Sequence, residues 1–396
     1  MTAFIEFFPV GNGDMTLITL ESGKRILIDI NIRQNADNEK KTDYPNVATM
    51  LKEGSLELDT NGRPYVDVFV LTHPDRDHCS GLTTHFHLGS PSTWKTADED
   101  ENQTILIREM WSSPLTFRRM DKVDGTLTPN AEAWQKEAKR RVKLFKDGDK
   151  NKNQDGNRIL ILGEDVHHEK TDGLEDIMIQ VGQTFQQICG QTDTSFSALL
   201  LSPQLVTVEE AETLSGKNNS SIVLLFTITS EKNNQAAKFL TGGDAEVGTW
   251  ERIWSRNLND TSKLKYNILQ TPHHCSLGVI SHDQYNDQGN NKGKGEGCEI
   301  SVDALKALSQ TMDGAFIIAS SEEPEKKSGK DLASRVYQNI ASKSSGKVFF
   351  TMVDSPDKPL KLTITSEGPN SSGKKEKFAP PIPPKIKKGT TERSYA

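Results

Sequence analysis

The chain has 396 residues and a formal net charge of −7, which excludes a general electrostatic attraction to nucleic acid. A polyanionic ligand would therefore have to meet a local basic patch. Four cysteines without paired spacing exclude a disulfide framework, and apolar stretches too short for a membrane span exclude an integral membrane protein. The N-terminus has no basic region followed by an apolar run, so we expect a cytoplasmic protein without a signal peptide or a membrane partner.

The chain is expected to begin with three short strands. Residues 3–8 and 15–20 are apolar enough for strands, and a Gly/Asn/Asp turn typical of a hairpin separates them. Residues 25–30 form the third strand, with Asp29 inside its apolar run. A buried carboxylate needs hydrogen bonds or a cation. We interpret Asp29 as a group that orients a neighbouring loop; an edge position is the alternative. A helix is expected over 45–54.

A buried strand over 67–72 leads into a loop that holds four potential metal ligands in six positions. These are His73, Asp75, Asp77 and His78. Pro74 stops the strand, so the ligands lie at its carboxyl end, where open sheets usually keep their sites. Two carboxylates and two imidazoles can hold a pair of divalent ions. The alternative is a polar turn that caps the next helix, but capping needs one Asp, not two flanked by histidines.

The middle of the chain, about 85–195, is expected to be a helical insertion that also contains a buried strand over 158–162. Its clearest element is a helix over 130–146, with apolar residues at helical spacing. His85 and His87 are expected in surface or packing roles. The basic residues of this region form either a solvated helix face or a surface that follows a phosphate backbone. The candidate nucleic-acid contacts are Arg118, Lys136, Arg140 and Lys143.

Two more strand ends carry metal-type side chains. Strands over 222–226 and 238–240 form an expected antiparallel pair, and the second runs into two glycines and Asp244. A strand over 266–270 ends in a turn that contains His273 and His274. Three strand ends with such side chains predict one shared site. Asp244 and the histidine pair should therefore lie within coordination reach of the 73–78 loop.

The C-terminal part completes the expected catalytic domain over 1–366. Its elements are a helix over 302–310, a strand over 315–319, a helix over 329–342 and strands over 347–352 and 359–365. Residues 367–396 are rich in Ser, Gly, Lys and Pro, and we expect a basic tail that is flexible or docks on a protein partner. A terminal segment without a role is the alternative.

The ordered set of motifs resembles the metallo-β-lactamase superfamily, and most closely the metallo-hydrolase domain of ComEC, the DNA-internalisation competence protein. Val10–Asp14 resembles that group's VGQGD turn, and Thr72–His78 resembles its variant of the HxHxDH motif. Asn218–Leu224, running on to Asp244, resembles its N-x-S-x-VL strand and TGD motif, and Pro272–Ser276 resembles PHHGS. The resemblance covers about 3–352. It implies an α/β fold, the αββα sandwich, and a two-metal hydrolase.

Three departures from the family pattern affect the site. Asp75 stands where most members have a second histidine, which shifts the preference from zinc toward manganese or magnesium without excluding zinc. Cys275 replaces a glycine. The usual lone histidine has no clear equivalent, so Asn218 or Asn219 is expected on that side. The membrane channel of the competence proteins is missing, so DNA uptake is not implied.

The resemblance implies roles for the ligands around two divalent metal ions. His73 and Asp75 would bind one ion, and Asp77 and His78 would bind the other together with His273 or His274. Asp244 would bridge the two. Asp14, Asp29 and Asn219 would support these ligands, and Asp77, His274 and Asp244 would act in catalysis.

We therefore expect a phosphodiesterase, in the first place a nuclease that cleaves DNA by a two-metal hydroxide mechanism in defence or DNA processing. A small-molecule hydrolase acting on a cyclic nucleotide, lactone or phosphoester is one alternative. A non-enzymatic effector or scaffold module is another.

Overall fold

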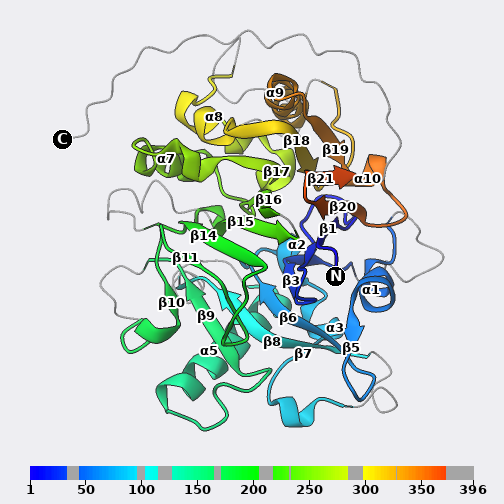
Figure 1. The fold of residues 1–396 in the computed structure, drawn as a ribbon, viewed down its shortest axis with the longest axis vertical. Helices are drawn as coiled ribbons and strands as arrows, with labels where there is room; N and C mark the ends of the chain where they lie inside the picture. Colours follow the sequence, from blue (N-terminus) through cyan, green and yellow to red (C-terminus); the bar gives the residue numbers. More distant parts are fainter. Residues whose placement is uncertain are drawn as a thin grey trace.

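The computed structural model describes residues 1–33, 44–95, 103–114, 127–164, 171–204, 217–231, 233–283, 298–326 and 328–371. Two mixed β-sheets lie at its centre, with helices on the outer side of each (Figure 1). The described residues thus form an α/β structure with four layers, in the order helices, sheet, sheet, helices.

The first sheet combines a parallel part and an antiparallel part. Its order is β10 (Met178–Ile179), β9 (Arg158–Leu162), β8 (Ile105–Ser112), β6 (Pro64–Val70), β3 (Arg25–Ile28), β2 (Thr16–Thr19), β1 (Phe4–Phe7), β20 (Leu360–Thr365) and β21 (Gly368–Ser371). Neighbours from β10 to β3 are parallel, and the remaining neighbours are antiparallel. The short strands β5 (Glu57–Leu58) and β7 (Phe86–His87) pair with β6 and β8, and β4 (Ile30–Asn31) follows β3.

The second sheet has the same mixed character. Its order is β11 (Thr184–Phe185), β14 (Phe196–Ser202), β15 (Val223–Ser230), β16 (Asn233–Thr241), β17 (Tyr266–Gln270), β18 (Thr311–Ala319) and β19 (Lys347–Phe350). Strands β11 to β16 are antiparallel, and β16 to β19 are parallel. A small hairpin of β12 (Gln187–Ile188) and β13 (Gln191–Thr192) stands apart.

Two sets of helices cover the outer faces. The first sheet is covered by α1 (Val47–Thr49), the π-helical turn η1 (Met50–Ser55), α2 (Arg76–Cys79), α3 (Leu82–His85) and α5 (Pro129–Lys146). The second is covered by α7 (Val247–Arg256), α8 (Val302–Leu308) and α9 (Gly329–Lys343); α10 (Thr351–Asp354) follows β19. The shorter turns are η2 (Pro91–Thr93), η4 (Glu175–Ile177), η5 (Lys217–Ser220), η6 (Thr261–Leu264), η7 (Pro272–Cys275) and η8 (Leu277–Val279). Among the helices of these residues, none is both long and apolar enough to cross a membrane.

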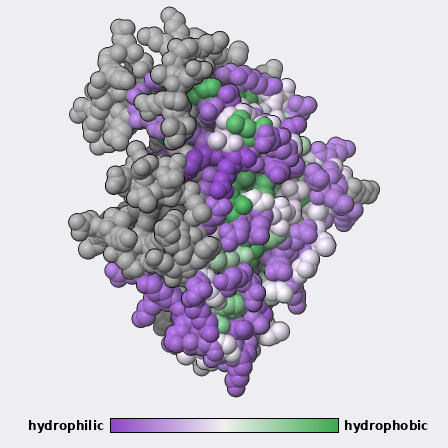
Figure 2. Space-filling view, turned by 90° about the vertical axis from the view of Figure 1, so that its left-hand side faces the viewer, coloured by the Kyte–Doolittle hydropathy of each residue, from purple (hydrophilic) through white to green (hydrophobic). Residues whose placement is uncertain are grey.

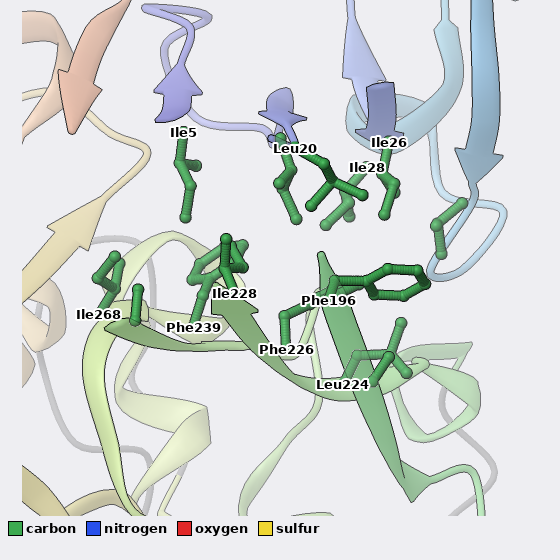
Figure 3. Packing of buried hydrophobic residues seen from close by; sticks show 14 of the residues in the cluster. Ile5, Leu20, Ile26, Ile28, Phe196, Leu224, Phe226, Ile228, Phe239 and Ile268 are labelled. Carbon is green, nitrogen blue, oxygen red and sulfur yellow. The ribbon is translucent and has the colours of Figure 1, made fainter. Parts of the chain in front are cut away.

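The sheets pack face to face through side chains that alternate along each strand. Ile5 and Ile26 point from the first sheet toward Phe226, Phe239 and Ile268 of the second (Figure 3). The intervening residues of the same strands face the helices instead, because successive side chains of a strand point to opposite sides. Both faces of each sheet are therefore buried, which explains the nearly continuous apolar runs in the sequence.

Helix α5 shows how the sequence sets one of these layers. The Thr128 side chain accepts a hydrogen bond from the Ala131 amide, and Pro129 occupies the first turn, both typical of a helix start. Trp134 and Ala138 continue the buried stripe from Ala131, and the Trp134 ring packs 5.1 Å from that of Phe69 in β6. The helix expected over 130–146 is confirmed.

The segment 85–195 is not a helical insertion. It adds β8, β9 and β10 to the first sheet and β11 to the second, and α5 covers the first sheet. Of these strands, β9 confirms the one expected over 158–162. The polar pair Arg108 and Glu109 interrupts the apolar run of β8, which hid this strand in the sequence. The Arg108 guanidinium stacks on Tyr65 and pairs with Asp67, and Glu109 accepts a hydrogen bond from the Trp111 indole.

Two smaller differences concern the C-terminal part. Residues 351–354 form α10, where the sequence indicated a strand continuing to 352. Strand β21 pairs with β20 beyond the expected boundary at 366, although its composition is that of the tail. The remaining tail, 372–396, lies outside the described residues. On the face shown in Figure 2, most of the described surface is hydrophilic and the hydrophobic areas are small.

The packing between the sheets predicts a large effect for Phe239→Ala. The ring is fully buried and meets Phe7 edge-on, with centroids 5.7 Å apart. Its loss should lower the free energy of unfolding by about 3–5 kcal/mol, because the lost burial is joined by a cavity. Urea denaturation checks this, with Leu258→Ala at an exposed position as the control expected to change by about 0.5 kcal/mol or less. Equal midpoints for the two variants would contradict this description of the core.

Candidate metal centre

Four loops from both sheets meet at one edge of the molecule. They are the turn after β1, the loop after β6, the loop after β16 and the turn after β17. Strands β16 and β17 are parallel, so their carboxyl ends lie at the same edge. β1 and β6 reach that edge from the other sheet, because β1 runs parallel to β3 through the antiparallel β2. The loops that hold Asp244 and the pair His273–His274 therefore lie beside the 73–78 loop, as expected.

Asp244 lies at the centre of this arrangement. Its Oδ1 is 3.0 Å from His78 Nε2 and 3.3 Å from His274 Nε2. Its Oδ2 is 3.7 Å from His73 Nε2 and 3.6 Å from His273 Nε2. Each carboxylate oxygen thus faces a different pair of imidazoles, which is the geometry of a carboxylate that can serve two ions.

The tighter of the two groups consists of Asp14, His78, Asp244 and His274. All four are buried, and one ligand atom from each lies within 4.8 Å of the others. His274 Nδ1 lies 3.3 Å from Asp14 Oδ1, and its Nε2 lies 3.3 Å from Asp77 Oδ2. His78 Nε2, Asp244 Oδ1 and both ring nitrogens of His274 are buried without a well-formed hydrogen bond. Convergent buried donor atoms of this kind fit a cation.

The second group is looser and closer to the surface. His73 Nε2 lies 3.8 Å from Asp75 Oδ2 and is also buried without a hydrogen bond. The side chains of Asp75 and His273 are 26% and 30% exposed, so this group is open to a ligand from outside. Together with Asp244 Oδ2, these three side chains could hold a second cation.

Asp29 fixes the ligand loop from behind. This fully buried carboxylate accepts hydrogen bonds from the Thr72 amide (2.7 Å), the Thr72 hydroxyl (2.6 Å) and His78 Nδ1 (2.8 Å). The bond to Nδ1 leaves Nε2 of His78 facing Asp244, where it can ligate a cation that displaces its proton. Asp29 adopts a left-handed conformation (φ 53°), which ends β3 and turns its side chain off the strand.

The histidine turn is held in a strained backbone conformation. His273, His274 and Cys275 have φ values of 48°, 50° and 67°, a region that costs a non-glycine residue about 1–3 kcal/mol. The His273 amide donates to the Gly243 carbonyl at 2.9 Å, which ties this turn to the Asp244 loop. Gly243 is required there, because a Cβ would lie 2.4 Å from the Thr72 hydroxyl.

The charges at the site are strongly coupled. Burial alone would lower the pKa values of His78 and His274, but Asp244, with Asp29 for one and Asp14 for the other, raises both well above the ordinary value. Burial and the nearby charge of His78 lower the pKa of His73 to about 4. Burial would raise the pKa of Asp244, but His78 and His274 hold that pKa well below its usual range. A bound cation would replace these protons, because imidazole ligates in its neutral form.

The structure gives Asp14 a more direct place than the sequence indicated. Its side chain was expected to support the ligands, yet it faces His274 within the tight group. Gly13 makes this possible, because a Cβ there would lie 2.1 Å from the Asn31 amide nitrogen and keep the turn away. The Gly-Asn-Gly-Asp spacing was the available signal, and it was interpreted as a hairpin turn.

The hydrogen bonds and ion pairs of Arg140, Lys143 and Asn218 go to residues other than the ligands. Arg140 is bound to Glu137, Asn157 and the Gly156 carbonyl, so its guanidinium supports the fold. Lys136 is exposed, and the exposed Lys143 pairs with Asp147. The Asn218 amide donates to Glu246. The side chain of Asn219 and all of Arg118 lie outside the described residues. His85 contacts Lys52, and His87 contacts the Ser90 carbonyl.

Comparison with known proteins adds little to this geometry. No protein-family model matches the chain, and no curated protein matches it. The crystal structure of a possible metal-dependent hydrolase from Veillonella parvula is similar over 88% of this chain and 96% of that one. The TM-score is 0.33 and the sequence identity is 10%. A similarity of this size does not establish a common fold, so the site is interpreted from its own residues.

The position of Asp244 predicts that Asp244→Asn abolishes stoichiometric metal binding. The substitution removes the negative charge of the carboxylate that faces both pairs of imidazoles. The affinity for manganese or zinc should therefore fall by at least about 100-fold. Metal content after equilibrium dialysis, measured by mass spectrometry, checks this. His87→Ala, which removes an imidazole outside the centre, should retain the wild-type content. Full metal content in Asp244→Asn would show that this cluster is not a metal site.

Asp29→Asn should weaken metal binding without removing a ligand. The amide nitrogen cannot accept a hydrogen bond from His78 Nδ1, so the ring would no longer be held in the ligating tautomer. The metal affinity should therefore fall about 10- to 100-fold. Asp193→Asn is a matched control, because Asp193 also accepts bonds from a backbone amide and hydroxyls but lies elsewhere. A competition titration with a metal-sensitive dye measures the difference. Equal affinities in both variants would rule out the orienting role.

Proposed function

We propose that the chain is a metal-dependent hydrolase of the metallo-β-lactamase superfamily, similar to the ComEC metallo-hydrolase domain, and that it cleaves the phosphodiester bonds of DNA. The observation that carries the proposal is the carboxylate of Asp244, whose two oxygens face two separate pairs of histidines. The αββα order of the layers and the order of the motifs along the chain support the same superfamily.

We assign the ligands to two divalent ions. Asp14, His78, His274 and Asp244 Oδ1 would hold one, and His73, Asp75, His273 and Asp244 Oδ2 the other. Bound ions would supply Lewis acidity toward the phosphate oxygens and activate water. The share of carboxylates among these ligands favours manganese or magnesium, with zinc as the alternative.

The protein's own residues prepare this chemistry. Asp244 spaces the two groups of ligands, and Asp29 keeps His78 in the ligating tautomer. Asp77 lies against His274 and is 40% exposed, so it can accept a proton from a substrate or water at the rim. Its pKa is held at about 2 by His274 and His78 despite partial burial, which keeps it ionised at neutral pH.

DNA is favoured over a small molecule by the position of α5. The helix starts beside α3, where the Asn130 side chain accepts hydrogen bonds from Thr83. Its 18 residues extend for about 27 Å at ~1.5 Å per residue. Lys136, Lys139 and Lys146 are exposed along it. A polymer bound at the centre could reach these lysines, whereas a cyclic nucleotide or lactone could not.

The free cysteines bear on where the protein would act. All four thiols are unpaired, which suits a reducing compartment. We therefore place the proposed activity in the cytoplasm, in DNA processing or defence. A scaffold role would not need so many buried ligating side chains.

Purified protein with manganese should cleave labelled single- or double-stranded DNA. The same preparation should also hydrolyse bis(p-nitrophenyl) phosphate, because the bond type is the same. Replacing Lys136, Lys139 and Lys146 with Gln should reduce DNA cleavage and its salt dependence, but leave the small diester unaffected. Gel assays measure the cleavage of DNA, and a colorimetric assay measures the hydrolysis of the small diester.

The alternatives give different results in these assays. Cleavage of a lactone or cyclic nucleotide but of neither DNA form would favour the small-molecule hydrolase. If the protein hydrolyses none of the substrates, the scaffold role is favoured whether or not the protein binds metal. An equal loss of both activities in the lysine variant would argue against α5 as a DNA contact.

A further inference from the structure

Lys330 is a cation placed between two of the ligand loops. It lies in the first turn of α9, and its Nζ donates to Asn12 Oδ1 at 2.6 Å. Asn12 is two residues before Asp14, in the turn after β1. Helix α9 also packs against the turn η7, which carries His274 and Cys275. Lys330 therefore lies next to two of the four loops that supply the tight group.

The Lys330 ammonium has no carboxylate partner. Within the described part of the chain it forms no ion pair, and its hydrogen bond goes to a neutral amide oxygen. Glu322 acts on it only at longer range, and burial lowers the pKa of Lys330. A partly buried ammonium without a counter-charge is costly for the fold, and such groups gather where an anion is to be bound.

The contacts around Asn12 hold this cation in place. The Asn12 carbonyl accepts bonds from the Asn31 amide and the Arg33 guanidinium, and Arg33 also donates to the Val10 carbonyl. The Arg33 guanidinium in turn stacks on Tyr44 at 3.8 Å. Asn12 is exposed, so the hydrogen bond that orients the lysine lies at the protein surface.

The charge of the centre shows why a separate cation matters. Asp14, Asp29, Asp75, Asp77 and Asp244 contribute −5, and two divalent ions would contribute +4, so −5 + 4 leaves −1. A centre of this charge gives an anionic substrate no net attraction. An ammonium beside the ions would provide it.

We propose that Lys330 binds an anionic oxygen of the substrate's phosphate group and positions that phosphate at the metal centre. This inference rests on the proposed function and identifies the residue that would favour an anionic phosphodiester over a neutral ester. Asn12 acts through Lys330, as a positioning residue. The role is one of binding, so the loss should appear mainly in KM and in phosphate affinity.

Binding of inorganic phosphate to the manganese-loaded protein tests this without turnover. Lys330→Gln should weaken phosphate binding about tenfold or more, the effect of losing one charged hydrogen bond, with unchanged metal content and melting temperature. Lys330→Arg should restore part of the affinity. Lys343→Gln is the matched control, since it removes an exposed lysine of the same helix about 20 Å away at ~1.5 Å per residue. Calorimetric titration gives the affinities.

Kinetics with bis(p-nitrophenyl) phosphate give the second arm. Lys330→Gln should raise KM about tenfold and change kcat less, and Lys343→Gln should change neither. Wild-type phosphate affinity in Lys330→Gln, or no phosphate binding by any form, would overturn the inference. A wild-type protein that cleaves no diester but binds phosphate through Lys330 would overturn the proposed function and leave this inference standing.

Discussion

The buried carboxylate of Asp244 is the constraint on which the whole site depends. A carboxylate in a dry environment is unstable unless cations or donors surround it. Here four imidazoles from two loops supply that environment, two on each oxygen. The loops have little freedom to move apart, because any separation would leave a buried charge without partners. The same attraction that a metal would exploit therefore already holds the loops in place.

The fold brings this about through the edges of its two sheets. His78 and Asp14 come from the first sheet, and Asp244 and His274 from the second, so the site spans the interface between them. The Thr16 hydroxyl of β2 donates to Gln270 at the end of β17, and the Ile222 amide donates to the Thr72 carbonyl. These polar links across the interface lie next to the ligands, and the aromatic packing of Phe7 on Phe239 continues behind them. Because the sheets pack rigidly, the ligating atoms of the candidate metal centre are held in fixed positions.

The sequence revealed the ligand loops because each is a local pattern. The run from His73 to His78 and the pair His273–His274 carry metal-type side chains directly after a buried strand. The place of Asp14 could not be found in this way, since its partner His274 is 274 − 14 = 260 positions away and only the folded chain joins them. Lys330 left no signal, because the sequence does not distinguish it from the neighbouring Lys326. Which basic residues of α5 stay available could not be predicted for a related reason, because the Arg140 guanidinium is engaged by Asn157, 17 positions along the chain.

The ligands of the tight group are spread over 274 − 14 = 260 positions of the chain, from Asp14 to His274, and β1 is completed by β20 near the other end. No shorter stretch of the chain therefore contains the centre, and a growing polypeptide still lacks it until the turn after β17 has been synthesised. The proposed metal site therefore forms only after that turn has been synthesised, and proteolytic fragments that end before it would lack the site.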